Sequence, residues 1–95
     1  MIGVIATLKV QDGKQQGFEA LMKELTAAVR ANEPACTLYQ LHKTEDPTTY
    51  VMLEQYQSED DLAKHRESSH FKTLGGKLGE FLAAAPGIQI LPAVE

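Results

Sequence analysis

The apolar positions in the first third of the chain change from a period of two to a helical period. Alternate residues are apolar over residues 2–10, which is typical of a strand with one buried face. After the turn residues Asp12 and Gly13, apolar side chains return at helical spacing, at Phe18, Leu21, Met22, Leu25 and Val29. This spacing predicts a helix over residues 14–32. Pro34 ends it, because proline lacks an N–H and restricts the residue before it.

A second strand-and-helix pattern follows. Residues 36–43 and 49–56 are rich in strand-forming side chains and flank a turn at Asp46, so they predict an antiparallel hairpin. Ser58, followed by three acidic residues, is a typical N-cap and predicts the start of a second helix. We expect this helix to extend to Pro86 along an apolar stripe formed by Phe71, Leu74, Leu78, Phe81, Leu82 and Ala85.

The predicted order of elements is βαββαβ, with a last strand over residues 88–92 that either fades out or lies at an edge because it contains Pro92. This is an α+β, ferredoxin-like plan, in which both helices cover one face of a four-stranded antiparallel sheet. Apolar residues occur on both faces of the strands, as with Val4 and Ile5, and two helices cover only one face. The pattern therefore predicts a homodimer that packs sheet against sheet.

Length and composition limit the classes of protein. A chain of 95 residues predicts a single domain over residues 1–95. The net charge of −4 argues against a nucleic-acid partner, because phosphates are bound by basic surfaces. The N-terminal apolar run is shorter than the roughly 20 residues that a membrane span needs, so we expect no membrane partner. The single cysteine, Cys36, favours a reducing cytoplasm.

His65 and His70 lie close together in the second predicted helix, and histidine is the side chain best suited to acid–base chemistry near neutral pH. On an unbroken helix, a spacing of five turns the second residue about 140° from the first. The two rings can therefore share a pocket only if the helix breaks at Ser68-Ser69, with Ser69 capping a new helix. The alternative is that both histidines lie on a solvent-exposed helix face.

Glu54 is a carboxylate in the middle of a strand whose same-face neighbours are aromatic or apolar. If that face is buried, Glu54 marks either a functional site or a structural ion pair; otherwise it is simply exposed. His42 shares a strand face with Leu38 and Gln40. We expect no bound metal, because there is no HExxH motif, no histidine pair at i, i+4, and no second thiol beside Cys36.

Four segments together resemble the antibiotic biosynthesis monooxygenase family, in its small quinol monooxygenase-like branch. They are residues 33–42, Asp46-Pro47, residues 50–56 with Glu54, and His65 with residues 68–71. The resemblance covers about residues 2–91. It implies a dimeric α+β barrel of ferredoxin-like subunits and a cofactor-free oxygenase. Such an enzyme binds a small aromatic substrate, a hydroquinone or polyphenol, whose anion reduces O2.

The resemblance also implies roles for individual residues. His65 and His70 are the expected bases, and Glu54 is expected to orient or tune one of them. The expected substrate-binding residues are Tyr39, His42, Met52 and Phe71. Heme degradation is not expected, because the chain has no tryptophan and has Gly75 where heme-degrading relatives have histidine.

Two other functions fit the same scaffold. One is isomerisation of a phosphorylated autoinducer-2-like signal, for which the available cations are Lys43, Lys64, Arg66 and Lys72. The other is a non-catalytic dimeric binding module, because a fold does not determine a function.

Overall fold

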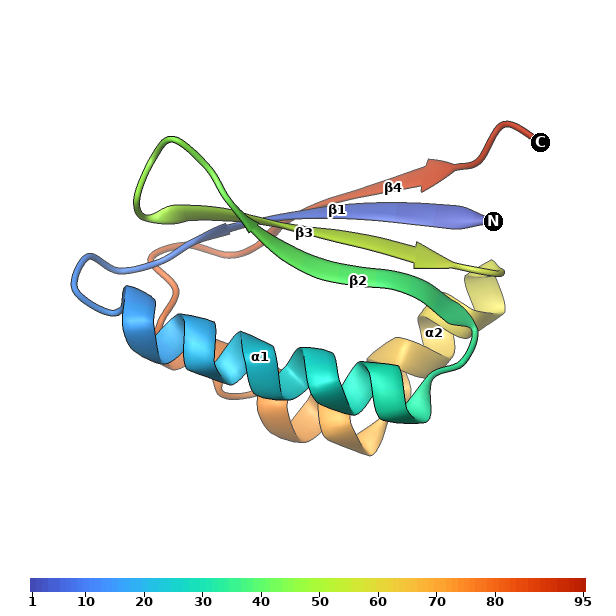
Figure 1. Cartoon of the computed structure of the whole chain (residues 1–95), viewed down its shortest axis with the longest axis horizontal. Helices are drawn as coiled ribbons and strands as arrows, with labels where there is room; N and C mark the ends of the chain where they lie inside the picture. The colour runs from blue at the N-terminus through green and yellow to red at the C-terminus, as the bar shows by residue number, and fades with distance from the viewer.

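The computed structural model describes residues 1–95 as two layers, a sheet and a layer of helices that covers one of its faces (Figure 1). The ferredoxin-like α+β plan is confirmed. The elements in chain order are β1 (Ile2–Lys9), α1 (Gln15–Asn32), β2 (Cys36–Lys43), β3 (Thr49–Tyr56), α2 (Glu59–Glu67), the π-helical turn η1 (Phe71–Gly75), the 3-10 turn η2 (Leu78–Glu80) and β4 (Gly87–Pro92). None of the helices is both long and apolar enough to cross a membrane.

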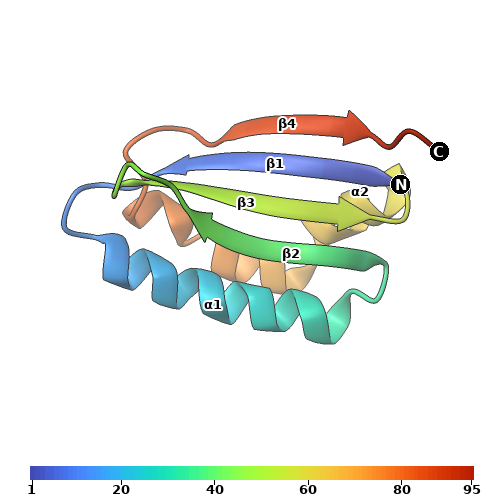
Figure 2. The same cartoon turned by 45° about the horizontal axis from the view of Figure 1, so that its top comes forward.

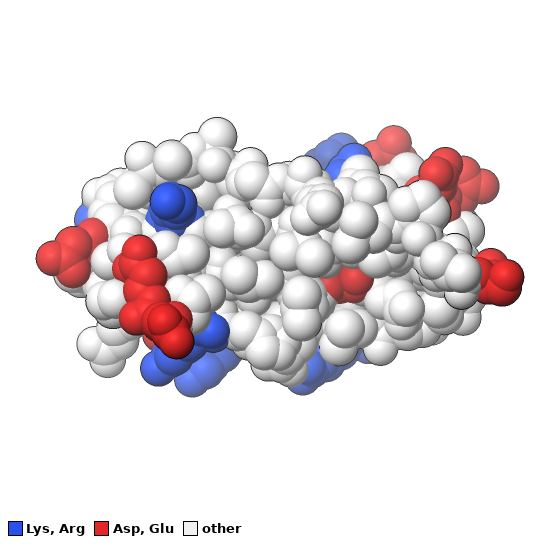
Figure 3. Space-filling view, turned by 90° about the horizontal axis from the view of Figure 1, so that it is seen from above, with Lys and Arg blue, Asp and Glu red and all other residues white.

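The four strands lie in the order β2-β3-β1-β4, and all neighbouring pairs are antiparallel (Figure 2). Strand β4 is at an edge, as Pro92 predicted. Alternation along β1 buries Val4 and Ala6 beneath the helices and turns Ile5 to the open face. Figure 3 shows the molecule from the side of this open face, with most charged residues around the margin. The middle of the open face is therefore largely uncharged.

One irregularity changes which residues of β2 face the helices. The pairing of β2 with β3 shifts between Cys36 and Leu38, which leaves Thr37 as an extra residue in a β-bulge. After the bulge, Tyr39 pairs with Glu54 and Tyr39 is buried on the helical side. The bulge thus places Tyr39 under the helices.

Helix α1 matches its predicted apolar stripe. Its buried residues are Phe18, Leu21, Met22, Leu25 and Val29, which pack against the sheet. The helix ends at Glu33, whose backbone N–H donates to the carbonyl of Val29 at 2.8 Å. The carboxylate of Glu33 is thereby held at the C-terminal end of α1, next to α2.

The second helical segment is shorter than predicted. Ser58 caps α2 as expected, since its Oγ accepts from the backbone N–H of Asp61. The predicted break is present, but Ser68 and not Ser69 makes it: Ser68 Oγ donates to the carbonyl of His65 at 2.7 Å and accepts from the N–H of Phe71 at 3.2 Å.

The prediction of one helix through Ala85 was wrong. After the break, helical structure continues from Ser69 only to the end of η1, followed by η2, which is consistent with the low helix propensity of Gly75, Gly76 and Gly79. Leu82 instead forms an isolated bridge with Val10. The chain from α2 to η2 therefore bends across the sheet instead of running straight along it, and a pocket lies beneath it.

Candidate active site

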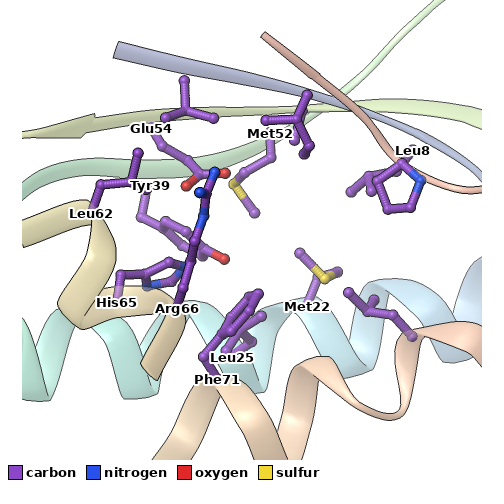
Figure 4. Close-up of a pocket in the computed structure, with 15 residues that line it drawn as sticks. Leu8, Met22, Leu25, Tyr39, Met52, Glu54, Leu62, His65, Arg66 and Phe71 are labelled. Carbon is purple, nitrogen blue, oxygen red and sulfur yellow. The ribbon is translucent and has the colours of Figure 1, made fainter. Parts of the chain in front are cut away.

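An apolar pocket lies between the helical face of the sheet and the segment from α2 to η2 (Figure 4). Its volume is about 100 Å³, and 11 of its 15 lining residues are hydrophobic. This volume is of the same order as a cavity of roughly 150 Å³ that accepts benzene. The pocket is therefore of a size for a single ring.

The sheet and the helices supply different walls of this pocket. Strands β1 and β3 contribute Val4, Ala6 and Met52, while β2 contributes Tyr39. Phe71 closes the pocket from η1, directly after the break at Ser68. Three of the four predicted substrate-binding residues, Tyr39, Met52 and Phe71, therefore line one pocket. Figure 4 shows the hydroxyl of Tyr39 pointing toward the interior of the pocket.

His65 is the buried polar residue of the pocket, with a side chain that is 3% exposed. Its ring lies among aromatic rings, with centroids 4.6 Å from Phe71, 5.3 Å from Tyr39 and 5.4 Å from Tyr56. This burial lowers the pKa of His65, although the neighbouring Glu33 carboxylate acts in the opposite direction. The neutral form of His65 is thus favoured.

Glu33 orients His65. Nδ1 of His65 lies 2.9 Å from Oε2 and 3.0 Å from Oε1 of Glu33. A carboxylate only accepts hydrogen bonds, so Nδ1 carries the proton in the neutral ring. The other ring nitrogen, Nε2, is then unprotonated and can act as a base toward the pocket.

His70 lies on the other side of the same carboxylate. Its Nε2 is 2.5 Å from Oε2 of Glu33, and its side chain is 15% exposed. His70 is absent from the lining of the apolar pocket; it borders a separate, more polar hollow together with Asp61 and Lys64. The break in the helix therefore brings His65 and His70 to one carboxylate and not to one pocket.

Glu54 lines the pocket, but its hydrogen-bond partner is not a histidine. Its Oε1 accepts from the hydroxyl of Tyr56 at 2.6 Å. Burial raises the pKa of Glu54, while the hydrogen bond from Tyr56 and the charge of Arg66 lower it. Figure 4 shows Arg66 extending from α2 toward Glu54. The role expected for Glu54 as the partner of a histidine belongs to Glu33.

His42 does not join the pocket. It lies three positions from Tyr39 on the same strand, and residues at odd spacing point to opposite faces of a sheet. His42 is exposed, and its Nδ1 lies 3.0 Å from the carbonyl oxygen of Gln40. The structure therefore does not bring Tyr39 and His42 to one pocket.

Two residues of the site, Glu33 and Arg66, were not among those expected from the sequence to bind or activate an aromatic substrate; Arg66 was expected only as a possible partner of a phosphate. Glu33 had one available signal: a negative charge at the C-terminal end of a helix is disfavoured by the helix dipole, and an acidic residue there suggests another partner. Arg66 had no comparable signal, because it occupies an exposed position of a charged helix.

Glu33, His65 and His70 are also the residues whose ligand atoms could surround a metal ion, with all three atoms within 4.8 Å of one another. Their spacing argues for hydrogen bonds instead. Ligands at about 2.0–2.1 Å from a tetrahedral zinc ion lie more than 3 Å from each other, whereas Glu33 Oε2 is within 2.9 Å of both imidazoles. Cys36 is not one of these three residues, and burial and the Glu33 charge raise its thiol pKa to about 11.

Comparisons with known proteins agree with this fold. The chain is similar to a crystal structure from Caulobacter crescentus assigned as an antibiotic biosynthesis monooxygenase, with 45% identity, a TM-score of 0.95, and coverage of 99% of this chain and 90% of that one. It is also 27% identical over 94 residues to Rv0793 of Mycobacterium tuberculosis, assigned as a monooxygenase, covering 99% of this chain and 92% of that protein. The structure of Rv0793 superposes with a TM-score of 0.90.

The family model for antibiotic biosynthesis monooxygenases matches residues 1–75, a range that contains every element from β1 to η1 and all three members of the His65, Glu33 and His70 cluster. The chain therefore belongs to the antibiotic biosynthesis monooxygenase family.

Proposed function

We propose that this protein is a cofactor-independent monooxygenase that oxidises a hydroquinone or related polyphenol with O2, with His65 as the general base. One observation carries the proposal: a buried histidine, whose Nδ1 is held by a carboxylate, forms part of the wall of an apolar pocket sized for one ring. The family membership supports monooxygenase chemistry. The apolar pocket supports a small aromatic substrate.

The proposed reaction begins with a proton transfer. Nε2 of His65 takes a proton from one substrate hydroxyl, and the resulting phenolate is a much better electron donor than the neutral phenol. The phenolate then reduces O2 and combines with it. One oxygen atom enters the ring and the other leaves as water, so hydroquinone and O2 give hydroxybenzoquinone and H2O. General-base assistance of this kind is typically worth 10²–10⁴-fold in rate.

The other lining residues have supporting roles in this proposal. Tyr39, Met52 and Phe71 pack against the ring and exclude water. The hydroxyl of Tyr39 keeps its proton, since burial raises its pKa, and can donate to a second substrate oxygen. Arg66 contributes a positive charge near the phenolate as it forms.

The pocket favours this chemistry over isomerisation of a phosphorylated signal. Arg66 is the one cation among its lining residues, and it faces the carboxylate of Glu54. A phosphate group would have to enter a mainly apolar space beside a carboxylate that has no second cation to balance it. A neutral aromatic ring does not carry that cost.

We also propose that two copies pack through the open faces of their sheets, in the cytoplasm. The largely uncharged middle of that face supports the assembly, because burial of charged groups would oppose it (Figure 3). The lone cysteine supports a reducing compartment. Sedimentation analysis at micromolar concentration tests the assembly; a monomer there would contradict it.

The decisive experiment for the reaction is oxygen uptake by chelator-treated protein with a panel of hydroquinones, against an autoxidation control. His65→Ala should lower kcat/KM at least tenfold, about 1.4 kcal/mol of transition-state stabilisation. His42→Ala is the matched control, because His42 lies outside the pocket, and it should leave uptake unchanged. Uptake no faster than autoxidation would contradict the proposed activity.

A further inference from the structure

We infer that Glu33, His65 and His70 act as one charge-sharing unit, in which His70 releases a proton to solvent when His65 takes one from the substrate. His70 does not touch the substrate in this arrangement; it is a positioning residue that acts through Glu33. The catalytic role of this unit rests on the proposed function. The sharing of charge does not, because it takes place in the protein without substrate.

The geometry gives both imidazoles the same counter-charge. Oε2 of Glu33 lies 2.9 Å from Nδ1 of His65 and 2.5 Å from Nε2 of His70. The Glu33 side chain is only 12% exposed, so little water separates it from the two rings. Each ring therefore experiences the full charge of one carboxylate at hydrogen-bond distance.

One carboxylate neutralises one imidazolium. With both rings protonated, the buried cluster would carry a net positive charge, and the two like charges would repel each other through a poorly screened medium. With one ring protonated, the cluster is neutral. Groups coupled in this way titrate as a pair, and protonation of one makes protonation of the other less favourable.

The two rings differ in exposure, and this difference sets the direction in which the proton moves, from the substrate pocket toward solvent. His65 is 3% exposed and lines the substrate pocket, whereas His70 is 15% exposed and borders the outer hollow. The proposed exchange starts with the His70 imidazolium paired with Glu33. When a substrate O–H proton moves to Nε2 of His65, Nδ1–H of His70 passes its proton to water. The cluster remains neutral, and the counter-charge of Glu33 now pairs with His65.

Other titratable groups face His65 from each element packed against it. These are Arg66 on its own helix, Glu54 and Tyr56 on β3, and Tyr39 on β2. None of them is hydrogen-bonded to either imidazole; the side-chain bonds of both rings go to Glu33. Glu33 is therefore the group through which the two histidines communicate.

Nuclear magnetic resonance of protein labelled with nitrogen-15 in histidine, without substrate and with a chelator present, tests this inference directly. In the wild type, the ring nitrogens of His65 and His70 should each report both protonation steps. His70→Gln keeps a side-chain donor for Glu33 but cannot titrate. In this variant His65 should titrate in one step, with its pKa raised by about one unit. Glu33→Gln should lower the pKa of His65, and the control His42→Gln should change nothing.

An unchanged His65 titration in His70→Gln would overturn the inference, even if Glu33→Gln proved too unstable to study. A difference in the Nδ1 and Nε2 signals between samples with and without chelator would also overturn the inference, because the cluster would then be a metal site. In oxygen uptake, His70→Gln should lower kcat about tenfold with KM unchanged. Loss of the proposed activity alone would leave the substrate-free titration intact, so the two failures are distinguishable.

Discussion

Nδ1 of His65 lies 2.9 Å from Oε2 of Glu33, although the two residues are 32 positions apart in the chain. The contact joins the C-terminal end of α1 to the last turn of α2. A negative charge at a helix C-terminus is disfavoured by the helix dipole, so the two imidazoles provide a favourable environment that the helix does not. The same contact leaves the opposite nitrogen of His65 free to act as a base.

The pH dependence of oxygen uptake should report this environment. Burial lowers the pKa of His65 below its ordinary value of 6.5, and the unprotonated ring is the active form. We expect kcat/KM to rise with pH through an ionisation below about 6.5 and then to level off. A pH–rate profile measures it; a single ionisation clearly above 6.5 would contradict a buried histidine base.

Glu54→Gln should stabilise the protein at neutral pH. The pKa of Glu54 is raised in the folded state, chiefly by burial, so the folded protein binds the proton more tightly than the unfolded chain. Glu54 therefore favours folding at low pH and disfavours it at neutral pH. The free energy of unfolding of Glu54→Gln should exceed that of the wild type at pH 7, and the difference should vanish as the pH falls below about 4.5.

Urea denaturation of Glu54→Gln at several pH values gives this measurement. The glutamine keeps a carbonyl oxygen to accept from Tyr56, so the comparison isolates the charge. Glu24→Gln on the exposed side of α1 is the control, and it should change stability by less than about 0.5 kcal/mol. Equal effects of the two substitutions would mean that burial of Glu54 has no cost.

Ser68→Ala should destabilise the break between α2 and η1. Ser68 Oγ donates to the carbonyl of His65 and accepts from the N–H of Phe71, and loss of a capping side chain costs about 1 kcal/mol. Ser69→Ala is the matched control: Ser69 is exposed, and its side chain makes no such bonds. Thermal denaturation should show a lower Tm for Ser68→Ala than for Ser69→Ala. A larger loss of stability in Ser69→Ala would show that Ser69, and not Ser68, provides the cap.

Gly76→Ala should also destabilise the protein, whereas Gly79→Ala should not. A Cβ at Gly76 would lie 2.7 Å from the backbone carbonyl oxygen of Lys72, so the turn after η1 would have to shift. A Cβ at Gly79 would meet nothing within 4 Å. We expect a loss of about 1–3 kcal/mol for Gly76→Ala, measured by denaturant unfolding. Equal stability of the two variants would show that the turn adjusts freely.

The sheet and α1 could be predicted because local periodicity alone determines them. Strands over residues 36–43 and 49–56 and the five buried residues of α1 follow directly from alternation and helical spacing. The end of the second helix could not be predicted from its apolar stripe, because Leu74 and Leu78 keep helical spacing across Gly75 and Gly76. There the low helix propensity of glycine, and not the pattern, determined the outcome.

The candidate site could be predicted only in part. Tyr39, Met52, His65 and Phe71, which line one pocket, were singled out from the sequence and its family resemblance. The partner of His65 could not be predicted, because Glu33 lies 32 positions away in the chain and meets His65 through the tertiary fold, not through any local spacing. Glu54 was the more conspicuous carboxylate, yet its charge faces Tyr56 and Arg66.

The bulge at Thr37 determines which residues of β2 form the wall of the pocket. If every residue from Cys36 onward paired in regular alternation, Leu38, Gln40 and His42 would turn toward the helices in place of Tyr39 and Leu41. The extra residue shifts that alternation by one, so the wall carries an aromatic ring in place of an amide and a histidine. Deletion of Thr37 alone would leave Tyr39 on the helical side, because Tyr39 would then follow Cys36 at a spacing of two. The strand can therefore lose one residue at this position in evolution with no change in the side chains that line the site.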